Sequence, residues 1–111
     1  MVNFETLVDE LFDDLEAELE GETDFNEDVL RTKIKSAVRE VALARKHPAT
    51  YTDEMIIADV ERYYPNIRRI ALYDYNQIGV EGQHTHLEND TRREYVNRDS
   101  LFYGVTPIAR I

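Results

Sequence analysis

The chain has 111 residues, 42% of them apolar, and a formal net charge of −10, which suits one small domain with a modest core. This acidic balance argues against a dedicated DNA or RNA binder, because binding to the phosphate backbone normally needs a basic surface. Cysteine is absent, which excludes disulfides and thiolate metal sites, and there is neither a membrane-length apolar run nor a signal sequence. We therefore expect a soluble chain that is made and used in cytoplasm.

The first predicted helix covers about residues 3–19. Apolar residues recur at spacings of three and four, as on one face of an amphipathic helix: Phe4, Leu7, Val8, Leu11, Phe12, Leu15 and Leu19. Asn3 is suited to cap the helix and Gly21 to end it.

Charge is unevenly placed along the sequence. Residues 1–30 hold twelve acids and no Lys or Arg, whereas residues 31–111 hold eleven acids and thirteen bases. We interpret the acids as a solvated helix face. The alternative is an acidic end that meets a basic face of a neighbouring subunit and so sets register and orientation.

The second predicted helix starts at a cap near Asn26 and ends at His47-Pro48. Its apolar stripe is narrow and rich in small residues, so another helix can approach closely: Leu30, Ile34, Ala37, Val38, Val41 and Ala42. Arg45 and Lys46 suit the negative end of this helix dipole.

The third predicted helix starts after Thr52, a good N-cap. The apolar positions keep helical phase straight through Pro65. Either one kinked helix covers about 53–77, or a further helix begins at Pro65. The unbroken phase favours the kinked helix, with Gly79 as its stop.

The remaining residues are read as a protrusion and a tail. Residues 80–98 are polar, and Asn89-Asp90 could turn a β-hairpin, although a loop fits nearly as well. Asp99 is suited to cap one short turn that Gly104 ends, and an apolar extended tail follows. The predicted fold is therefore mainly α: a single domain over 1–111 with three to four helices (about 3–78), a polar loop or hairpin (about 80–98), and a short helix with a C-terminal tail (99–111).

The sequence carries no recognisable catalytic motif: it has neither a nucleophile elbow nor a glycine-rich phosphate loop. His84 and His86 would share one face of a strand, and Glu81, Glu88 or Asp90 could add a third metal ligand. Two histidines in a polar loop are more often solvated or contact residues. We expect no metal, no cofactor and no enzymatic activity.

Tyrosine and arginine side chains gather around the third helix. We interpret the tyrosines as the rim of an ordinary core. The alternative is a protein interface, where both residue types are enriched. The interface hypothesis, extended to the protrusion and the tail, names Arg62, Tyr64, Arg68, Arg69, His84, His86, Arg92, Arg93, Tyr95, Val105, Pro107, Ile108 and Ile111.

The order of three segments carries a resemblance to a known family. They are IALYDYNQIGVEG at 70–82, HLENDTRREY at 86–95, and VTPIA at 105–109. After a helical first half, this pattern resembles the head-tail connector proteins of tailed phages, also called head-completion adaptors. The similarity covers most of the chain and is strongest over 63–109.

The resemblance implies a structural protein of the virion that waits in the host cytoplasm before assembly. Such proteins form a ring, typically of twelve copies, beneath the portal. The ring extends the DNA channel and presents a platform to the next connector or stopper and the tail. DNA would pass without specific binding, and a C-terminal extension would reach a partner. Arg92 and Arg93 depart from a DNA-repelling wall and would either grip phosphate weakly or pair with an acidic first helix.

Two other functions stay open from the residues. The acids of residues 1–30 would suit a small intracellular regulator that binds a protein partner as nucleic-acid mimics do. A metal-dependent enzyme would use His84, His86 and nearby acids.

Overall fold

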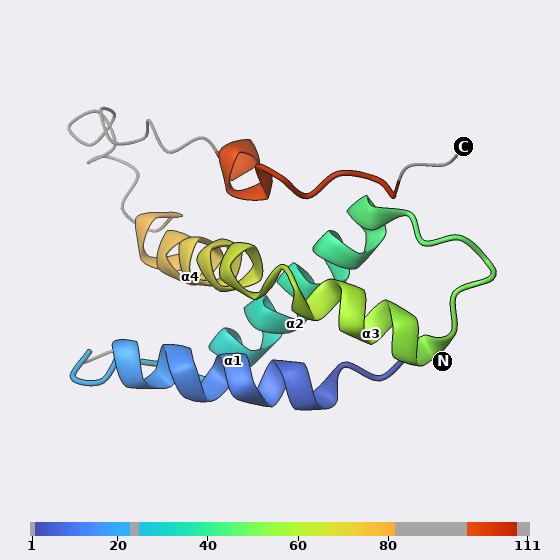
Figure 1. The fold of residues 1–111 in the computed structure, drawn as a ribbon. Coiled ribbons are helices and arrows are strands. Elements are labelled where there is room, and N and C mark those ends of the chain that lie inside the picture. The colour runs from blue at the N-terminus through green and yellow to red at the C-terminus, as the bar shows by residue number, and fades with distance from the viewer. Residues whose placement is uncertain (1, 23–24, 82–97, 109–111) are drawn as a thin grey trace.

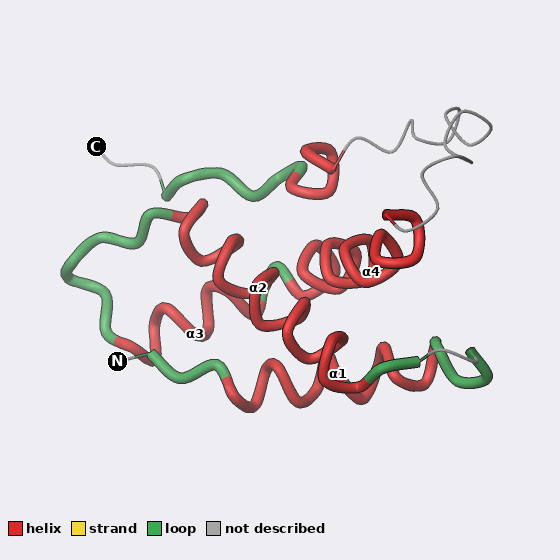
Figure 2. Tube along the Cα trace, turned by 180° about the vertical axis from the view of Figure 1, so that it is seen from behind, coloured by secondary structure: helices red, strands yellow, loops and turns green. Residues whose placement is uncertain are grey.

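The computed structural model describes residues 2–22, 25–81 and 98–108 of the chain. Its elements are α1 (Glu5–Glu18), α2 (Glu27–Arg45), α3 (Asp53–Glu61), α4 (Tyr64–Glu81) and a 3-10 helix η3 (Arg98–Phe102). Within these ranges there is no strand (Figures 1 and 2). The predicted class, a small and mainly helical bundle, is confirmed.

Helix α2 is the centre of the bundle, because it packs against α1, α3 and α4. Its predicted stripe is buried except for Ala42, which is half-buried. Every other element except η3 adds fully buried apolar side chains to the same core, and so does the C-terminal segment. The core comprises Leu7, Val8, Leu11, Phe12, Leu15, Leu19, Leu30, Ile34, Ala37, Val38, Val41, Val60, Ile67, Ile70, Ala71, Tyr75 and Val105.

Local capping chemistry sets several of the helix ends. Asn26 Oδ1 accepts the Val29 N–H at 3.1 Å, and Thr52 Oγ1 accepts the Met55 N–H at 3.1 Å, which confirms both predicted N-caps. Asn3 lies one residue before the cap position of α1, and its side chain accepts the Glu5 N–H at 2.8 Å. At the end of α2, Lys46 adopts a left-handed conformation with φ of 50°, which turns the chain away from the helix.

The preferred prediction of one kinked helix over 53–77 is wrong, and the alternative of a separate helix at Pro65 is correct. Pro65 has no N–H, and in a continuous helix its ring would clash with the carbonyl of Glu61, the last residue of α3. The apolar phase survives the break, since Val60 and Ile67 are both fully buried. Helix α4 also continues through Gly79 to Glu81, because one glycine inside a helix costs only about 1 kcal/mol.

The C-terminal segment returns across the bundle toward the far end of α2 (Figure 1). Its 3-10 turn over Arg98–Phe102 packs on α4, so the predicted short turn is present. The turn begins one residue earlier than predicted, and Asp99 lies inside it instead of capping it. Gly104 has a positive φ of 89° and redirects the chain, so that Val105 enters the core. The predicted hairpin or loop falls mostly on residues 82–97, outside the described residues, while 80 and 81 belong to α4. None of the helices in the described ranges is both long and apolar enough to span a membrane.

Candidate interaction surfaces

Two of the predicted interface residues, Tyr64 and Arg68, hold α4 against α1 of the same chain. The Tyr64 hydroxyl donates to Asp14 Oδ2 at 3.1 Å, and Arg68 Nε donates to the same oxygen at 2.8 Å. Arg68 also pairs with Glu18. The Arg68 hydrogen bond lowers the pKa of Asp14, while burial and then the Asp14 hydrogen bond raise the pKa of Tyr64. Tyr64 and Arg68 therefore bind carboxylates of their own subunit.

The other predicted interface residues divide by exposure. Val105 is buried in its own core and Ile108 is half-buried, so the described part of the tail docks on its own chain. Arg62, Arg69 and Pro107 are exposed. A last group lies outside the described residues: His84, His86, Arg92, Arg93, Tyr95 and Ile111.

A buried charge cluster, formed by Arg45, His47 and Asp59, joins the end of α2 to α3. Arg45 Nε and Nη2 donate to the two Asp59 oxygens at 2.8 and 2.9 Å, in a forked geometry. His47 Nε2 lies 2.8 Å from Asp59 Oδ2. The Asp59 and Arg45 side chains are only 8% and 12% exposed, so this ion pair is largely shielded from water.

The electrostatics of this cluster favour the charged forms of Asp59 and Arg45. The Arg45 hydrogen bond lowers the pKa of Asp59, against the effect of burial, which alone would raise it. The Asp59 hydrogen bond raises the pKa of Arg45 in turn. The sequence alone did not lead us to predict this cluster. Its available signal was an acid, Asp59, placed beside Val60 and three residues after Ile56 on the inward-facing part of α3.

Arg45 also fastens the C-terminal segment. Its Nη1 donates to the Thr106 carbonyl at 2.8 Å, and its own carbonyl accepts the Ile108 N–H at 2.7 Å. The start of the segment is held in a similar way by Arg98, which contacts both Asp74 oxygens at 2.8 and 2.7 Å and Glu40 at 2.9 Å. Hydrogen bonding to Asp74 raises the pKa of Arg98. The segment is therefore tied at both ends to the bundle.

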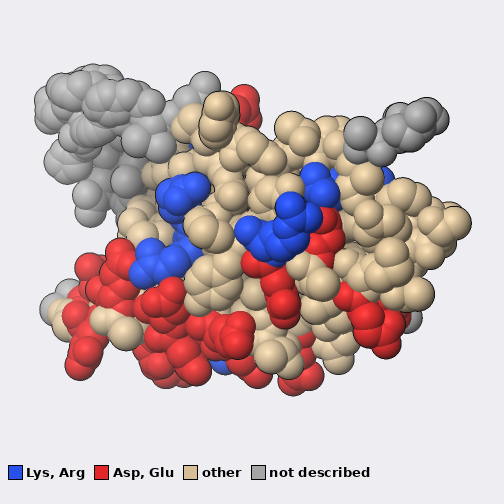
Figure 3. Space-filling view, viewed as in Figure 1, with Lys and Arg blue, Asp and Glu red and all other residues tan. Residues whose placement is uncertain are grey.

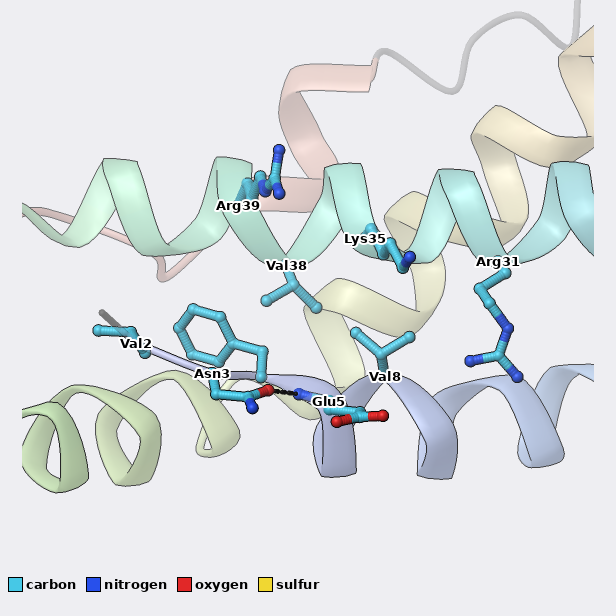
Figure 4. A pocket seen from close by; sticks show the side chains of 9 residues that line it. Val2, Asn3, Glu5, Val8, Arg31, Lys35, Val38 and Arg39 are labelled. Atoms are coloured by element: carbon cyan, nitrogen blue, oxygen red, sulfur yellow. Dashed lines mark hydrogen bonds between the residues drawn. The ribbon is translucent and has the colours of Figure 1, made fainter.

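A groove of about 880 Å³ runs between α2 and the N-terminal segment that leads into α1 (Figure 4). Its floor is apolar and is formed by Val2, Phe4, Val8 and Val38. Figure 4 shows Val8 and Val38 pointing toward each other from the two helices. Asn3 and Glu5 also line it on the side of α1. Because the floor is apolar and the groove open, it can accept a chain or side chains from another molecule.

One rim of this groove, which we call the basic rim, consists of Arg31, Lys35 and Arg39 on successive turns of α2. Arg31 pairs with Asp9 at 2.8 Å and lies over the Phe12 ring. Lys35 and Arg39 are exposed, and neither has an ion pair within the described residues. In so acidic a chain these two cations are available to a partner.

An acidic surface lies on the outer face of α1, where acidic residues gather along the lower edge of the view in Figure 3. Toward the C-terminal end of α1, five acids border a second hollow of about 490 Å³: Asp13, Glu16, Glu20, Glu22 and Glu27. None of them has an ion pair within the described ranges. This end of the molecule thus presents uncompensated negative charge to solvent.

Within residues 2–22, 25–81 and 98–108, no group of three or more His, Asp or Glu side chains is placed to hold a metal ion. The predicted pair His84 and His86 lies outside these ranges. Comparison with known proteins gives no relatives, since no protein-family model, no curated protein and no solved structure matches the chain.

Proposed function

We propose that this chain is a structural subunit of the head-tail connector of a tailed phage. In this role it assembles as a ring of about twelve copies beneath the portal and extends the DNA channel. It also presents a docking platform to the next connector or stopper and the tail. Its partners are other copies of itself, the portal, and the stopper or tail-completion protein.

The observation that carries the proposal is how the described residues divide their charges. The arginines 45, 68 and 98 are used within the chain, where their carboxylate partners hold the helices and the C-terminal segment in one arrangement. Lys35 and Arg39 border an open apolar groove and have no such partner among the described residues. A protein with a fixed shape and with unpaired charge around an open groove is suited to bind other proteins.

The acidic face over α1 fits the same role. Exposed carboxylates there that no subunit contact covers repel the phosphates of passing DNA. A channel wall of this kind lets DNA slide without specific binding.

The direct test is deletion of the gene from its phage, followed by electron microscopy of the particles. We expect packaged heads that lose their DNA or lack tails, and rescue when the chain is supplied from a plasmid. Filled heads with stable DNA and attached tails in the deletion mutant would contradict the proposal. A second measurement mixes the purified chain with portal rings and looks for comigration in a density gradient, for which bovine serum albumin of matched concentration serves as the unbound control.

A second candidate function is a small acidic regulator that binds a protein through its N-terminal helix. The exposed carboxylates at the end of α1 favour it. A pull-down with the tagged chain distinguishes the two functions: recovery of a host DNA-binding enzyme supports the regulator, and recovery of portal or capsid proteins supports the connector.

A further inference from the structure

We propose that the groove with the basic rim receives the acidic end of α1 from a second copy of this chain, so that copies associate head to tail. The acidic end is defined here as the stripe of Asp13, Glu16 and Glu20. This inference rests on the proposed function in that it names the contact between neighbouring subunits.

The groove has the features of a docking surface. Its apolar floor offers Val2 and Phe4, which are half-buried, to an incoming surface. Lys35 and Arg39 stand beside it, four residues apart, or about 6 Å along the axis of α2. Glu5 is the one acid among the residues that line the groove, so it offsets at most one of these two cations. Arg31 is already paired with Asp9. A positive charge therefore remains for an acidic partner.

The acidic end matches this pattern in spacing and sign. Glu16 and Glu20 are also four residues apart, and Asp13 continues the stripe three residues earlier. Ala17, exposed on the last turn of α1, lies between them, and Glu20 follows in the turn just past the end of the helix. The small side chain of Ala17 lets this end of α1 approach the apolar floor closely. Two ion pairs, Lys35 with one glutamate and Arg39 with the other, form when the two helices lie side by side.

The two surfaces lie toward opposite ends of α1. Glu5 lines the groove and Glu16 belongs to the acidic end, and the eleven residues that separate them along α1 span about 16 Å. A copy that offers its groove to one neighbour therefore leaves its acidic end free for another. Such a heterologous contact repeats from copy to copy, and it closes into a ring when the rotation per subunit allows.

The test is sedimentation analysis of the full chain at low ionic strength, with protein up to about 1 mM so that weak contacts are populated. We expect wild-type chains to self-associate and the association to weaken in high salt, where screening shortens the range of charge interactions. The double substitution Lys35→Glu with Arg39→Glu should weaken association about tenfold or more. The matched control, Lys33→Glu with Arg69→Glu, changes the net charge equally outside the groove and should change association by less than about twofold.

A charge exchange makes the test specific for the two surfaces. Glu16→Lys with Glu20→Arg gives a chain with two basic surfaces, and the Lys35→Glu with Arg39→Glu chain has two acidic ones. Each alone should associate about tenfold or more weakly than wild type, whereas their equimolar mixture should regain association, because every groove then meets an end of opposite charge. Far-UV circular dichroism of each variant establishes that it is folded.

Three results would overturn the inference: a wild-type chain that stays monomeric throughout, a groove variant that associates like wild type, or a mixture no better than its components. The connector role is tested separately by the deletion mutant. If the groove variant fully rescues that mutant, the inference fails and the connector stands. If the deletion has no effect on particles while the charge exchange works, the connector fails and the self-contact stands.

Discussion

Removal of the Asp59 carboxylate should destabilise the fold more than any other single loss of charge on α3. In Asp59→Ala, Arg45 loses hydrogen bonds of 2.8 and 2.9 Å and keeps its guanidinium in a site where only 12% of the side chain is exposed. Breaking a buried ion pair by removing one partner costs about 3–5 kcal/mol. A domain of ordinary stability has about 5–15 kcal/mol in total, so the variant should lose roughly a fifth or more of its free energy of unfolding.

The assay is urea unfolding followed by far-UV circular dichroism, with the free energy of unfolding extrapolated to water. Glu61→Ala is the control, because Glu61 is an exposed acid on the same helix with no ion pair among the described residues, and it should change stability by less than about 0.5 kcal/mol. A cycle with Arg45→Met should show that the two substitutions together cost about 1–3 kcal/mol less than their sum. A loss below about 1 kcal/mol in Asp59→Ala would refute the reasoning, since a buried guanidinium without its carboxylate partner must cost more than a surface pair.

Three further predictions concern Asp59, Arg98 and Lys46. The pKa of Asp59 is lowered in the folded chain. The stabilisation by its carboxylate is therefore fully present above the unfolded pKa of about 3.9 and is lost as pH falls through the lower folded value. Acid titrations should show the stability difference between wild type and Asp59→Asn shrinking below about pH 4, and a constant difference would contradict the linkage. Arg98→Ala should cost about 1–2 kcal/mol and speed hydrogen exchange at the Val105 and Ile108 amides, whereas Arg69→Ala, which removes an exposed arginine, should leave both rates unchanged. Lys46→Gly should raise the free energy of unfolding by about 0.5–1 kcal/mol in urea, because glycine adopts a φ of 50° without steric cost; a destabilised variant would show that the lysine side chain contributes more than its backbone costs.

Periodicity and capping predicted the helices well because both are local. The spacing of apolar residues alone was enough to predict the buried stripes of α1 and α2. Asn26 and Thr52 marked the starts of α2 and α3, because their side chains accept hydrogen bonds from the first turn of each helix. Pro65 was harder, since the apolar phase on both sides is compatible with a kink or with a break. The break became visible only in the three-dimensional arrangement.

The charged contacts could not be predicted from spacing. Arg45 and Thr106 are 61 residues apart, and Arg98 and Glu40 are 58 apart. No local pattern relates such positions. The interface hypothesis chose Tyr64 and Arg68 by residue type alone, and type does not show that Asp14 of the same chain already binds both. The groove was likewise missed, because Lys35 and Arg39 look in sequence like an ordinary solvated helix face.

The attachment of the C-terminal segment to Arg45 has a consequence for folding order. Helical proteins usually fold quickly because most of their contacts are local. Here the guanidinium and the carbonyl of Arg45, in the middle of the chain, bind Thr106 and Ile108, which lie near its C-terminal end. We expect residues 105–108 to dock only after the helices that form their binding site have packed. The same segment should be the first to detach when the protein is warmed.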